Sequence, residues 1–263
     1  MPHLPKISCL TATLDRFDFL KRSIRCFCDQ TYPNKEMVIV TEGAAAYKEK
    51  IREHVTSLNR TDIRLEFLDG DNYNLGKVRN ISIARASGDL ICQWDDDDLF
   101  HPLRLEIQAR DMLEKNCRAS FLTDQLQYFW DSGEMFWLDW NSAGNDMLRL
   151  IPGTLLMYKD ARFSYPESGE NAVKGEDSGL LAQIYRNVPI ARLSGFGYLY
   201  VYGFHAENTF DYDHHRALSA ERSVSPDRFV KDLAEFEKAL ACYPIPRPFS
   251  IYRFTREKVL TLE

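Results

Sequence analysis

Four consecutive aspartates are the side chains best suited to chemistry in this chain of 263 residues: Asp95, Asp96, Asp97 and Asp98. They follow a short apolar run at residues 90–92, which is typical of a buried strand. Neighbouring carboxylates repel one another, whereas a divalent cation holds them together, because Mg²⁺ and Mn²⁺ prefer oxygen ligands and also bind phosphates. Open α/β sheets bind ligands at the carboxyl ends of their strands. The run therefore indicates a metal-phosphate site or, as many acidic runs do, a solvated loop.

A second acidic pair, Glu176 and Asp177, follows Gly175 at the expected start of a helix. An apolar stripe at helical spacing marks that helix: Leu180, Leu181, Ile184 and Tyr185. A displacement reaction by a hydroxyl group needs one general base, and Asp177, with Glu176 beside it, would serve. The alternative is that both acids only complement the positive end of the helix dipole.

The elements that must position these acids alternate between strand and helix patterns in the first half of the chain. We expect strands at residues 7–12, 37–40, 63–68 and 90–93. The helices expected between them run from Phe17 to before Tyr32, through His54, from a cap at Asn74 to Gly88, and after Pro102. This order predicts an α/β fold with a mostly parallel central sheet flanked by helices.

The second half of the chain carries a different pattern. Residues 121–123, 126–130 and 134–140 are expected to form antiparallel strands, with a hairpin turn at 131–133. Another strand is expected at 151–157. A tail helix is expected on an apolar stripe that precedes a proline-rich stretch: Phe229, Leu233, Phe236 and Leu240.

Composition excludes several classes of protein. Net charge is −6, from 33 basic and 39 acidic residues without a basic block, so nucleic acid is not an expected partner. Apolar residues make up 44% of the chain, but no run of about 18 predicts a membrane-spanning helix, and the amino terminus lacks the apolar segment of a secretory signal. The 6 cysteines form no CxxC pair, which disfavours zinc and suits a reducing, cytoplasmic location. Peripheral association with a membrane stays open.

Several short motifs follow one another in a characteristic order. They are Thr11-Ala12-Thr13, Asp-Gln-Thr-Tyr-Pro at 29–33, Glu-Met-Val-Ile-Val at 36–40, Asn-Leu-Gly-Lys at 74–77 with Arg79 and Asn80, Ser-Gly-Asp at 87–89, the aspartate run and Gly-Glu-Asp at 175–177. In this order they resemble the family 2 glycosyltransferases, inverting enzymes of GT-A fold that use nucleotide-sugar donors. The resemblance covers residues 1–190 and weakens afterwards.

The resemblance implies a role for each acidic motif. Asp97 would be the first ligand of a Mn²⁺ or Mg²⁺ ion, His205 would complete its shell, and Asp177, with Glu176, would supply the catalytic base. Asp98 would hold the metal's waters or orient the loop. The remaining implied residues would bind the nucleotide or the donor: Thr11, Ala12, Thr13, Arg16, Glu42, Asn74, Gly76, Lys77, Arg79, Asp95 and Asp96.

Four of these assignments have an alternative. Arg79 would also suit an exposed helix face. His205 would also suit a structural role, with His214 and His215 as a competing pair. Lys77 would equally suit an exposed helix face, and Asp96 occupies the motif's variable position, which an exposed side chain also suits. By the same resemblance, residues 1–118 would bind the nucleotide sugar, residues 119–225 would bind the acceptor and carry the base, and residues 226–263 would form a carboxyl-terminal helix and tail.

Two departures from the family refine the expected function. Thr41-Glu42 stands where many members have two acids, so Glu42 alone would contact the nucleobase, and UDP is the favoured but less secure carrier. A Gln-x-x-Arg-Trp sequence, usual in processive polymer synthases, does not follow Asp177. The resemblance therefore implies a non-processive, metal-dependent transferase that moves a sugar to the hydroxyl of a glycan, a lipid-linked molecule or another acceptor.

Two rival functions make different demands on the sequence. An inactive glycosyltransferase-like protein that binds nucleotide sugars or glycans would not need Asp95, Asp97 and Asp177 intact. An aspartate-rich prenyl-diphosphate synthase would be all helical, which the strand patterns disfavour. Five aromatic residues would either stack on sugar faces or fill the core: Trp137, Trp140, Tyr198, Tyr200 and Tyr202.

Overall fold

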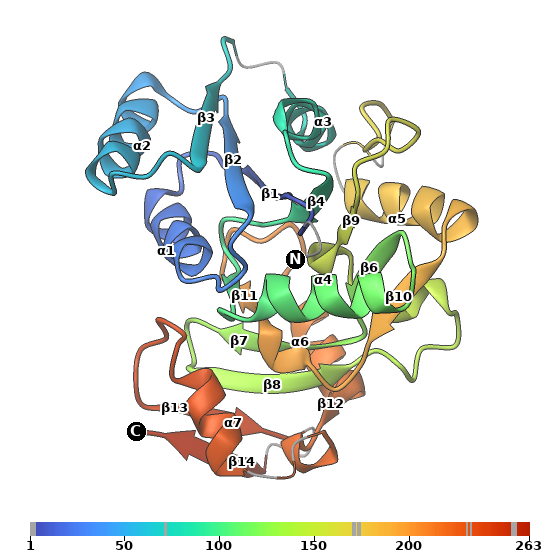
Figure 1. The fold of residues 1–263 in the computed structure, drawn as a ribbon. Coiled ribbons are helices and arrows are strands. Elements are labelled where there is room, and N and C mark those ends of the chain that lie inside the picture. Colours follow the sequence, from blue (N-terminus) through green and yellow to red (C-terminus); the bar gives the residue numbers. More distant parts are fainter. Residues whose placement is uncertain are drawn as a thin grey trace.

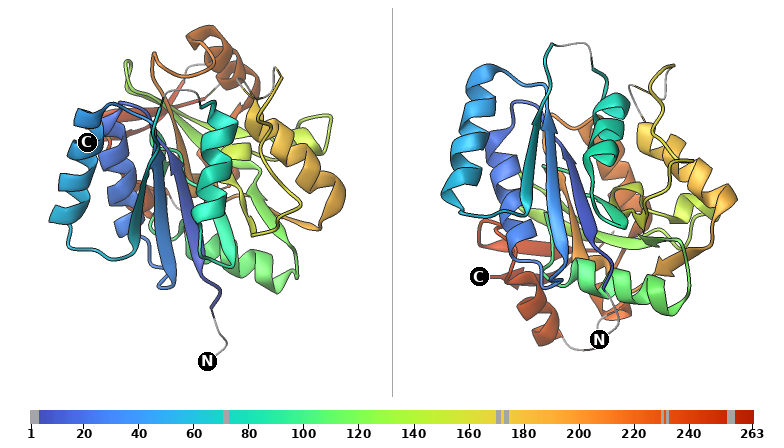
Figure 2. Two further views of the ribbon diagram at one scale, coloured as in Figure 1. Left: turned by 90° about the horizontal axis from the view of Figure 1, so that it is seen from above. Right: turned by 45° about the horizontal axis from the view of Figure 1, so that its top comes forward.

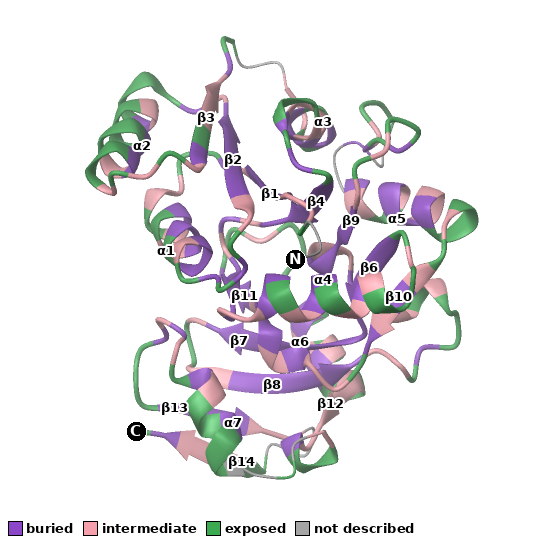
Figure 3. Cartoon of the chain, in the orientation of Figure 1, coloured by how far each residue is buried: buried purple, intermediate pink, exposed green. Residues whose placement is uncertain are grey.

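Two mixed β-sheets share one apolar core in the computed structural model of the chain (Figure 1). The structure describes residues 4–70, 73–169, 172, 175–229, 231, 233–253 and 257–263. Buried residues follow the strands of both sheets and the helix sides that face them, whereas the outer sides of the helices are exposed (Figure 3). No helix in these ranges is long and apolar enough to cross a membrane.

The first sheet has the strand order β10-β6-β9-β4-β1-β2-β3. Its strands are β1 (Ile7–Ala12), β2 (Lys35–Thr41), β3 (Ile63–Phe67), β4 (Leu90–Gln93), β6 (Ala119–Leu122), β9 (Leu156–Tyr158) and β10 (Ile190–Leu193). The strands from β3 to β4 are parallel, as are β6 and β10, and only β9 runs antiparallel to its neighbours. The predicted mostly parallel sheet is confirmed.

Helices cover both faces of this sheet (Figure 2). On one face, α1 (Phe17–Cys28), α2 (Ala45–Ser57) and α4 (Arg104–Glu114) bury their apolar stripes in the core that contains Ile7 and Cys9. On the other face, α3 (Leu75–Arg85) and α5 (Glu176–Asn187) pack with Leu10 and Ile91. The alternation of side chains along the strands therefore sends neighbouring residues to different helical layers.

The second sheet has the order β14-β13-β8-β7-β11-β5, and β12 pairs with β8. Its strands are β5 (Leu99–Phe100), β7 (Asp124–Phe129), β8 (Glu134–Asp139), β11 (Tyr200–Phe204), β12 (Ser223–Val224), β13 (Phe249–Tyr252) and β14 (Lys258–Leu262). Two helices accompany it, α6 (Tyr212–Arg222) and α7 (Leu233–Leu240). Because β5 begins directly after the aspartate run, residues 95–98 lie where the chain passes from the first sheet to the second.

The structure corrects two of the expected strands. Residues 121–123 are expected in the antiparallel set with 126–130 and 134–140, but β6 joins the first sheet beside β9 and β10. Only β7 and β8 form the expected hairpin, and Gly133 takes the positive φ of 66° in its turn. Residues 151–157 are not one strand, because Pro152 begins a 3₁₀ turn, Pro152–Thr154, and the strand starts at Leu156.

Three helix predictions also need correction. The α3 helix ends at Arg85 rather than at Gly88, because Ala86 is already extended, with ψ of 133°. The tail helix begins at Leu233, whereas Phe229 lies outside it and stacks on the Trp137 ring. Tyr185 is 36% exposed and is not part of the buried stripe of α5. The helix α6 and the strands β10, β11, β13 and β14 were not predicted.

Candidate active site

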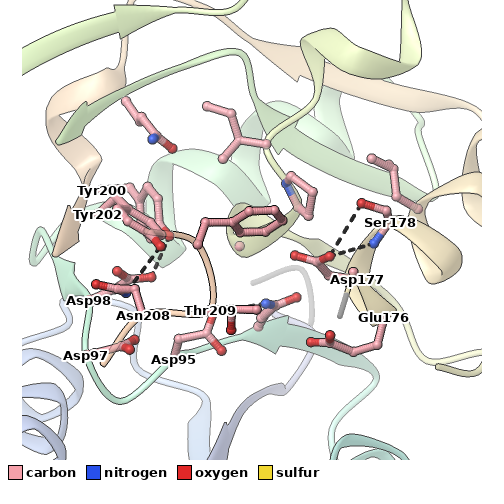
Figure 4. Close-up of a pocket in the computed structure, with 18 of the residues that line it drawn as sticks. Asp95, Asp97, Asp98, Glu176, Asp177, Ser178, Tyr200, Tyr202, Asn208 and Thr209 are labelled. Carbon is pink, nitrogen blue, oxygen red and sulfur yellow. Dashed lines mark hydrogen bonds between the residues drawn. The ribbon is translucent and has the colours of Figure 1, made fainter. Parts of the chain in front are cut away.

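A pocket of about 420 Å³ brings the two predicted acidic motifs together (Figure 4). The aspartate run lines one side, and Glu176, Asp177 and Ser178 at the start of α5 line another. Tyr200 and Tyr202 of β11 and the loop that follows β11 complete this part of the wall. The pocket therefore lies at the carboxyl end of β4, where the sequence predicted a ligand site.

Arg79 joins the two acidic motifs. Its Nη1 atom lies 2.8 Å from Asp95 Oδ1, and its Nε atom donates to Glu176 Oε1 at 3.1 Å. Arg79 is 9% exposed and Glu176 is 5% exposed, so this cation is shared by two largely desolvated carboxylates. Removing one partner of a buried ion pair leaves an uncompensated charge. We infer that Arg79 fixes the position of Asp95 relative to α5.

A buried amide supports the same aspartate from its other side. Gln93 Nε2 donates to Asp95 Oδ2 at 2.9 Å, and Gln93 Oε1 accepts from the hydroxyl of Tyr165 at 3.1 Å. Asn80 of α3 holds the Tyr165 backbone by accepting from its N–H at 2.8 Å and donating to its carbonyl at 2.9 Å. Both oxygens of the Asp95 carboxylate are therefore held by residues that are themselves fixed.

Asp96 is only 1% exposed, which corrects the expectation of an exposed side chain. It accepts hydrogen bonds from Thr13 Oγ1 at 2.7 Å and from Arg16 Nη2 at 2.6 Å. Burial, with the nearby charge of Asp97, raises the pKa of Asp96 to about 7. Asp96 thus ties the loop after β1 to the aspartate run.

Asp97 lies between two basic side chains. Its Oδ2 atom is 2.9 Å from Arg16 Nη1 and 3.2 Å from His205 Nε2. Burial opposes ionisation of Asp97, but the hydrogen bond from His205 and the charge of Arg16 outweigh it and lower the pKa of Asp97. The predicted proximity of His205 to Asp97 is therefore present in the structure.

Asp98 forms hydrogen bonds with two residues of β11. Its Oδ2 atom accepts from the Tyr200 hydroxyl at 2.5 Å, and its Oδ1 atom accepts from the Gly203 backbone N–H at 3.0 Å. Burial, with the neighbouring charges of Asp97 and Asp95, raises the pKa of Asp98 well above its ordinary value. These two hydrogen bonds join the aspartate run to β11.

Asp177 lies in the first turn of α5 and is half-buried. The helix begins after Gly175, whose φ of 87° is in the left-handed region that favours glycine. The Ser178 N–H donates to Asp177 Oδ1 at 2.7 Å, and no cation pairs with this carboxylate in the part of the chain described. Burial raises the pKa of Asp177, although the charge of Arg79 partly opposes that shift. A carboxyl group with a raised pKa that lines a pocket suits a general base.

Several residues expected to bind the donor or its metal ion do not line the pocket: Thr11, Thr13, Glu42, Asn74, Gly76 and Lys77, and the expected metal ligand His205. Thr11 donates to the Trp94 carbonyl at 2.7 Å, beneath the aspartate run. Asn74 caps α3 by accepting from Lys77 N at 2.9 Å and also donates to the carbonyl of Glu167. A side chain at Gly76 would lie 1.9 Å from the Pro166 carbonyl.

Through these contacts, Asn74 and Gly76 at the start of α3 support the pocket without lining it. Lys77 is exposed, and its ammonium group lies over the Tyr73 ring, as its alternative assignment predicted. Glu42, at the end of β2, keeps one buried carboxylate oxygen, Oε2, without a hydrogen-bond partner among the described residues. Of the residues expected to contact the donor, five line the pocket directly: Ala12, Arg16, Arg79, Asp95 and Asp96.

The residues around Asp97 fit a divalent cation only in part. No group of three or more histidine, cysteine or acidic side chains in the described ranges is arranged to hold a metal. The 3.2 Å separation of Asp97 Oδ2 and His205 Nε2 suits adjacent ligands of one ion, which lie about 3 Å apart at the usual bond lengths. However, His205 Nδ1 accepts from the Glu207 N–H at 3.2 Å, so the proton of the neutral ring is on Nε2. Asp97 Oδ2 can ligate only after it gives up one of its hydrogen bonds with Arg16 and His205, and His205 must exchange tautomer and lose its bond to Glu207.

A buried cation beneath the site was not predicted from the sequence. Arg104 is fully buried, and its Nη2 atom donates to the carbonyls of Gln93 at 3.3 Å and Gly153 at 3.4 Å. The guanidinium also lies over the rings of Trp94 and Phe100. Gln93 and Tyr165 were missed as well, because their roles depend on contacts between distant segments. An arginine on the apolar face of a predicted helix was the available signal for Arg104.

Comparison with known sequences gives one consistent family. The profile described as Glycosyl transferase family 2 matches residues 8–165. An uncharacterized glycosyltransferase of Rickettsia bellii is 26% identical over 193 residues, which are 68% of this chain and 26% of that protein. The putative colanic acid biosynthesis glycosyl transferase WcaA of Escherichia coli is 35% identical over 108 residues, or 41% of this chain and 38% of its own. The matches thus span less than half the length of these curated relatives.

Solved structures share the fold at low sequence identity. TarS of S. aureus, residues 1–349 in complex with UDP-GlcNAc, has a TM-score of 0.60 at 18% identity and covers 89% of this chain and 72% of its own. The mannosyltransferase PcManGT of Pyrobaculum calidifontis, in complex with GDP-Man and Mn²⁺, has a TM-score of 0.57 at 13% identity and covers 84% of this chain and 62% of its own. The predicted GT-A fold is confirmed.

Proposed function

Because this chain belongs to glycosyl transferase family 2, we propose that it moves a sugar from a nucleoside-diphosphate donor, with UDP favoured, to an acceptor hydroxyl and inverts the anomeric centre. One sugar would be added in each encounter. The observation that carries this proposal is the bridge from Asp95 through Arg79 to Glu176, which holds the two acidic motifs in one pocket. We assign donor binding to residues 1–118, acceptor binding and the base to residues 119–225, and a supporting role to the tail at 226–263.

The aspartate run would hold the donor diphosphate. Asp97 would be the protein ligand of a Mn²⁺ or Mg²⁺ ion, with His205 joining after its tautomer exchange. When bound, the ion supplies Lewis-acid neutralisation of the leaving diphosphate. Asp95, fixed by Arg79 and Gln93, would accept hydrogen bonds from the ribose or the nucleotide.

Asp177 would take the proton from the acceptor hydroxyl. The new bond forms between that oxygen and the anomeric carbon, while the bond from this carbon to the diphosphate oxygen breaks and its electron pair leaves with the diphosphate. Direct displacement needs the base and the leaving group on opposite sides of the sugar. The positions of Asp177 and the aspartate run support this arrangement, because they line different sides of the pocket.

Two measurements together test this function. A panel of nucleotide sugars, screened by thermal shift with Mn²⁺ or with EDTA, should show metal-dependent stabilisation by one donor. Proton NMR should then show slow hydrolysis of the donor. If the sugar is α-linked in the donor, the β anomer of the free sugar should appear first. Asp177→Asn should lose this hydrolysis, and Asp131→Asn, at an exposed turn, is the matched control. Binding of a donor without any turnover would favour a nucleotide-sugar-binding protein instead.

A further inference from the structure

Polar atoms without partners gather on the wall of the pocket that lies on the second sheet. They are Gln125 Oε1, both polar atoms of the Gln127 side chain, Trp140 Nε1 and His215 Nδ1. None of them has a hydrogen-bond partner among the described residues, although all are buried, and all four residues line the pocket. Gln127 is 1% exposed and Gln125 is 4% exposed. Unsatisfied buried polar groups are few in native proteins and are usually explained by a bound water or ligand.

The two amides face the aspartate run. Gln125 and Gln127 are two residues apart on β7 and so lie on the same face of the sheet. Gln127 is the direct partner of Tyr202 on β11, and Tyr200, two residues before it, donates from that face to Asp98. The unpaired amides are therefore on the side of the second sheet that the proposed reaction uses.

Neighbouring groups fix the outer side of this wall. The Tyr202 ring stacks on the His215 ring, with centroids 5.0 Å apart, and its hydroxyl accepts from Asn208 Nδ2 at 3.2 Å. Burial, with the neighbouring His214, lowers the pKa of His215 to about 4, so the ring is neutral at neutral pH. Tyr202, His215 and Asn208 thus offer neutral hydrogen-bonding groups.

The charges of the pocket disfavour an anionic acceptor. Seven acidic residues line it: Asp95, Asp96, Asp97, Asp98, Glu176, Asp177 and Glu207. Its two lining arginines, Arg16 and Arg79, are each already shared by two carboxylates. A phosphate or a carboxylate on the acceptor would find no unpaired cation among the described lining residues, and it would be repelled by the acids.

The rest of the wall is apolar. It is formed by Met147, Leu148, Leu150, Ile151, Leu181 and Leu218. A sugar ring presents hydroxyl groups at its edge and C–H groups on its faces, so it matches a site that combines amides with apolar side chains. Amides also suit hydroxyls because each amide both donates and accepts hydrogen bonds.

We propose that Gln125, Gln127 and His215 form an acceptor subsite that binds an uncharged sugar, in preference to a uronic acid or a sugar phosphate. This inference rests on the proposed glycosyl transfer and names the acceptor class for it. The hydroxyl groups of the sugar satisfy the unpaired amides, and its apolar face lies against the leucine-rich wall.

Saturation-transfer NMR with UDP and diamagnetic Mg²⁺ present tests this subsite. The probes are methyl glucoside and methyl galactoside, with methyl glucuronide and glucose 1-phosphate as anionic counterparts. We expect the neutral glycosides to bind more tightly than the anionic probes. Gln127→Leu should weaken their binding about tenfold, the effect of losing one or two hydrogen bonds. Gln125→Leu is the second variant.

Gln108 provides the matched control. It is also fully buried, but its Nε2 atom donates to the carbonyls of Ser120 at 3.2 Å and Thr154 at 2.7 Å, and it does not line the pocket. Gln108→Leu should lower the melting temperature and leave glycoside binding unchanged. Gln127→Leu should leave the melting temperature unchanged or raise it, because it removes an unsatisfied amide.

Each outcome decides between the two proposals. If UDP with Mg²⁺ binds but no neutral glycoside does, or if both glutamine variants bind glycosides as the wild type does, the subsite is refuted and the transfer reaction stands. Tighter binding of the anionic probes also refutes it. If no nucleotide sugar binds or reacts, the proposed function itself has failed.

Discussion

The two ends of the pocket differ in how their polar atoms are paired. At the donor end, each carboxylate of the aspartate run already has partners within the protein. At the acceptor end, the amides of Gln125 and Gln127 have none among the described residues. Close carboxylates must be neutralised by the protein before any ligand binds. Neutral amides can stay unpaired until a ligand binds, because an unpaired buried amide costs less free energy than an unpaired buried charge. The donor end is therefore preorganised, and the acceptor end is completed by its ligand.

Replacing the base should give the largest effect. Asp177→Asn keeps the shape and hydrogen bonding of the side chain but removes its basicity. We expect turnover to fall by about 10²–10⁴, the usual contribution of a general base, with donor affinity little changed. Steady-state kinetics with a saturating donor measure this. Wild-type turnover in the variant would assign the base role to Glu176 or to another carboxylate.

Removing the bridge should break the preorganised end. Arg79→Met leaves Asp95 and Glu176 buried without their cation, and we expect a loss of about 3–5 kcal/mol in the free energy of unfolding. Urea denaturation at neutral pH measures it. Arg25→Met is the control, because the Arg25–Asp29 pair is exposed and separated by 3.8 Å, so its loss should be less than about 1 kcal/mol. Equal effects of the two substitutions would contradict the bridging role.

The two acidic motifs were predictable because their evidence is local, although only five of the eleven residues expected to bind the donor line the pocket. Aspartates after an apolar run and an acidic pair at a helix start are visible in the sequence, and the motif order adds the roles. Arg79 was assigned to the donor, but its contacts with Asp95 and Glu176 depend on α3 meeting α5. The support from Tyr165 was not predictable, since it requires Asn80 to clamp a distant segment.

The acceptor end was not predictable for physical reasons. Gln125 and Gln127 alternate with Leu126 and Tyr128, a pattern typical of a strand with one solvent-facing side. The structure covers that side with α6, which has few apolar residues at helical spacing. The pairings of β7 with β11 and of β8 with β13 join distant parts of the chain, and β5 has only two residues, too few for a pattern.

Acid should reduce the contribution of His215, at the acceptor end, to the free energy of unfolding between about pH 6.5 and pH 4. Burial lowers the pKa of His215 to about 4, below its ordinary value of 6.5, so the unfolded chain binds more protons between these pH values. Stability from this group is complete above about pH 6.5 and falls as the pH drops toward 4, by up to about 3 kcal/mol. His101 has a similarly lowered pKa and titrates in the same window. Asp96, whose pKa is raised to about 7, acts in the opposite direction in this window. His215→Phe should therefore lower the wild-type slope by the contribution of one proton, measured by urea denaturation across this range, and an unchanged slope would contradict the neutral ring.

Metal-dependent donor binding should depend on one carboxylate. UDP at about 100 times its Kd should stabilise the wild type by about 2.7 kcal/mol more with Mn²⁺ than with EDTA, if binding without metal is negligible. Asp97→Ala should abolish this difference and also lower the stability of the free protein, because it removes the partner that Arg16 and His205 share. Thermal shift with both additives measures it. A difference that survives in the variant would place the metal on other ligands.

Anomalous diffraction at the manganese absorption edge, from crystals grown with UDP and Mn²⁺, tests the central assignment most directly. We expect one manganese peak at about 2.0–2.2 Å from a carboxylate oxygen of Asp97, with the diphosphate bound to the same ion in the pocket that Asp177 lines. A nucleotide bound outside this pocket, or manganese held there without Asp97, would contradict the account of the donor end.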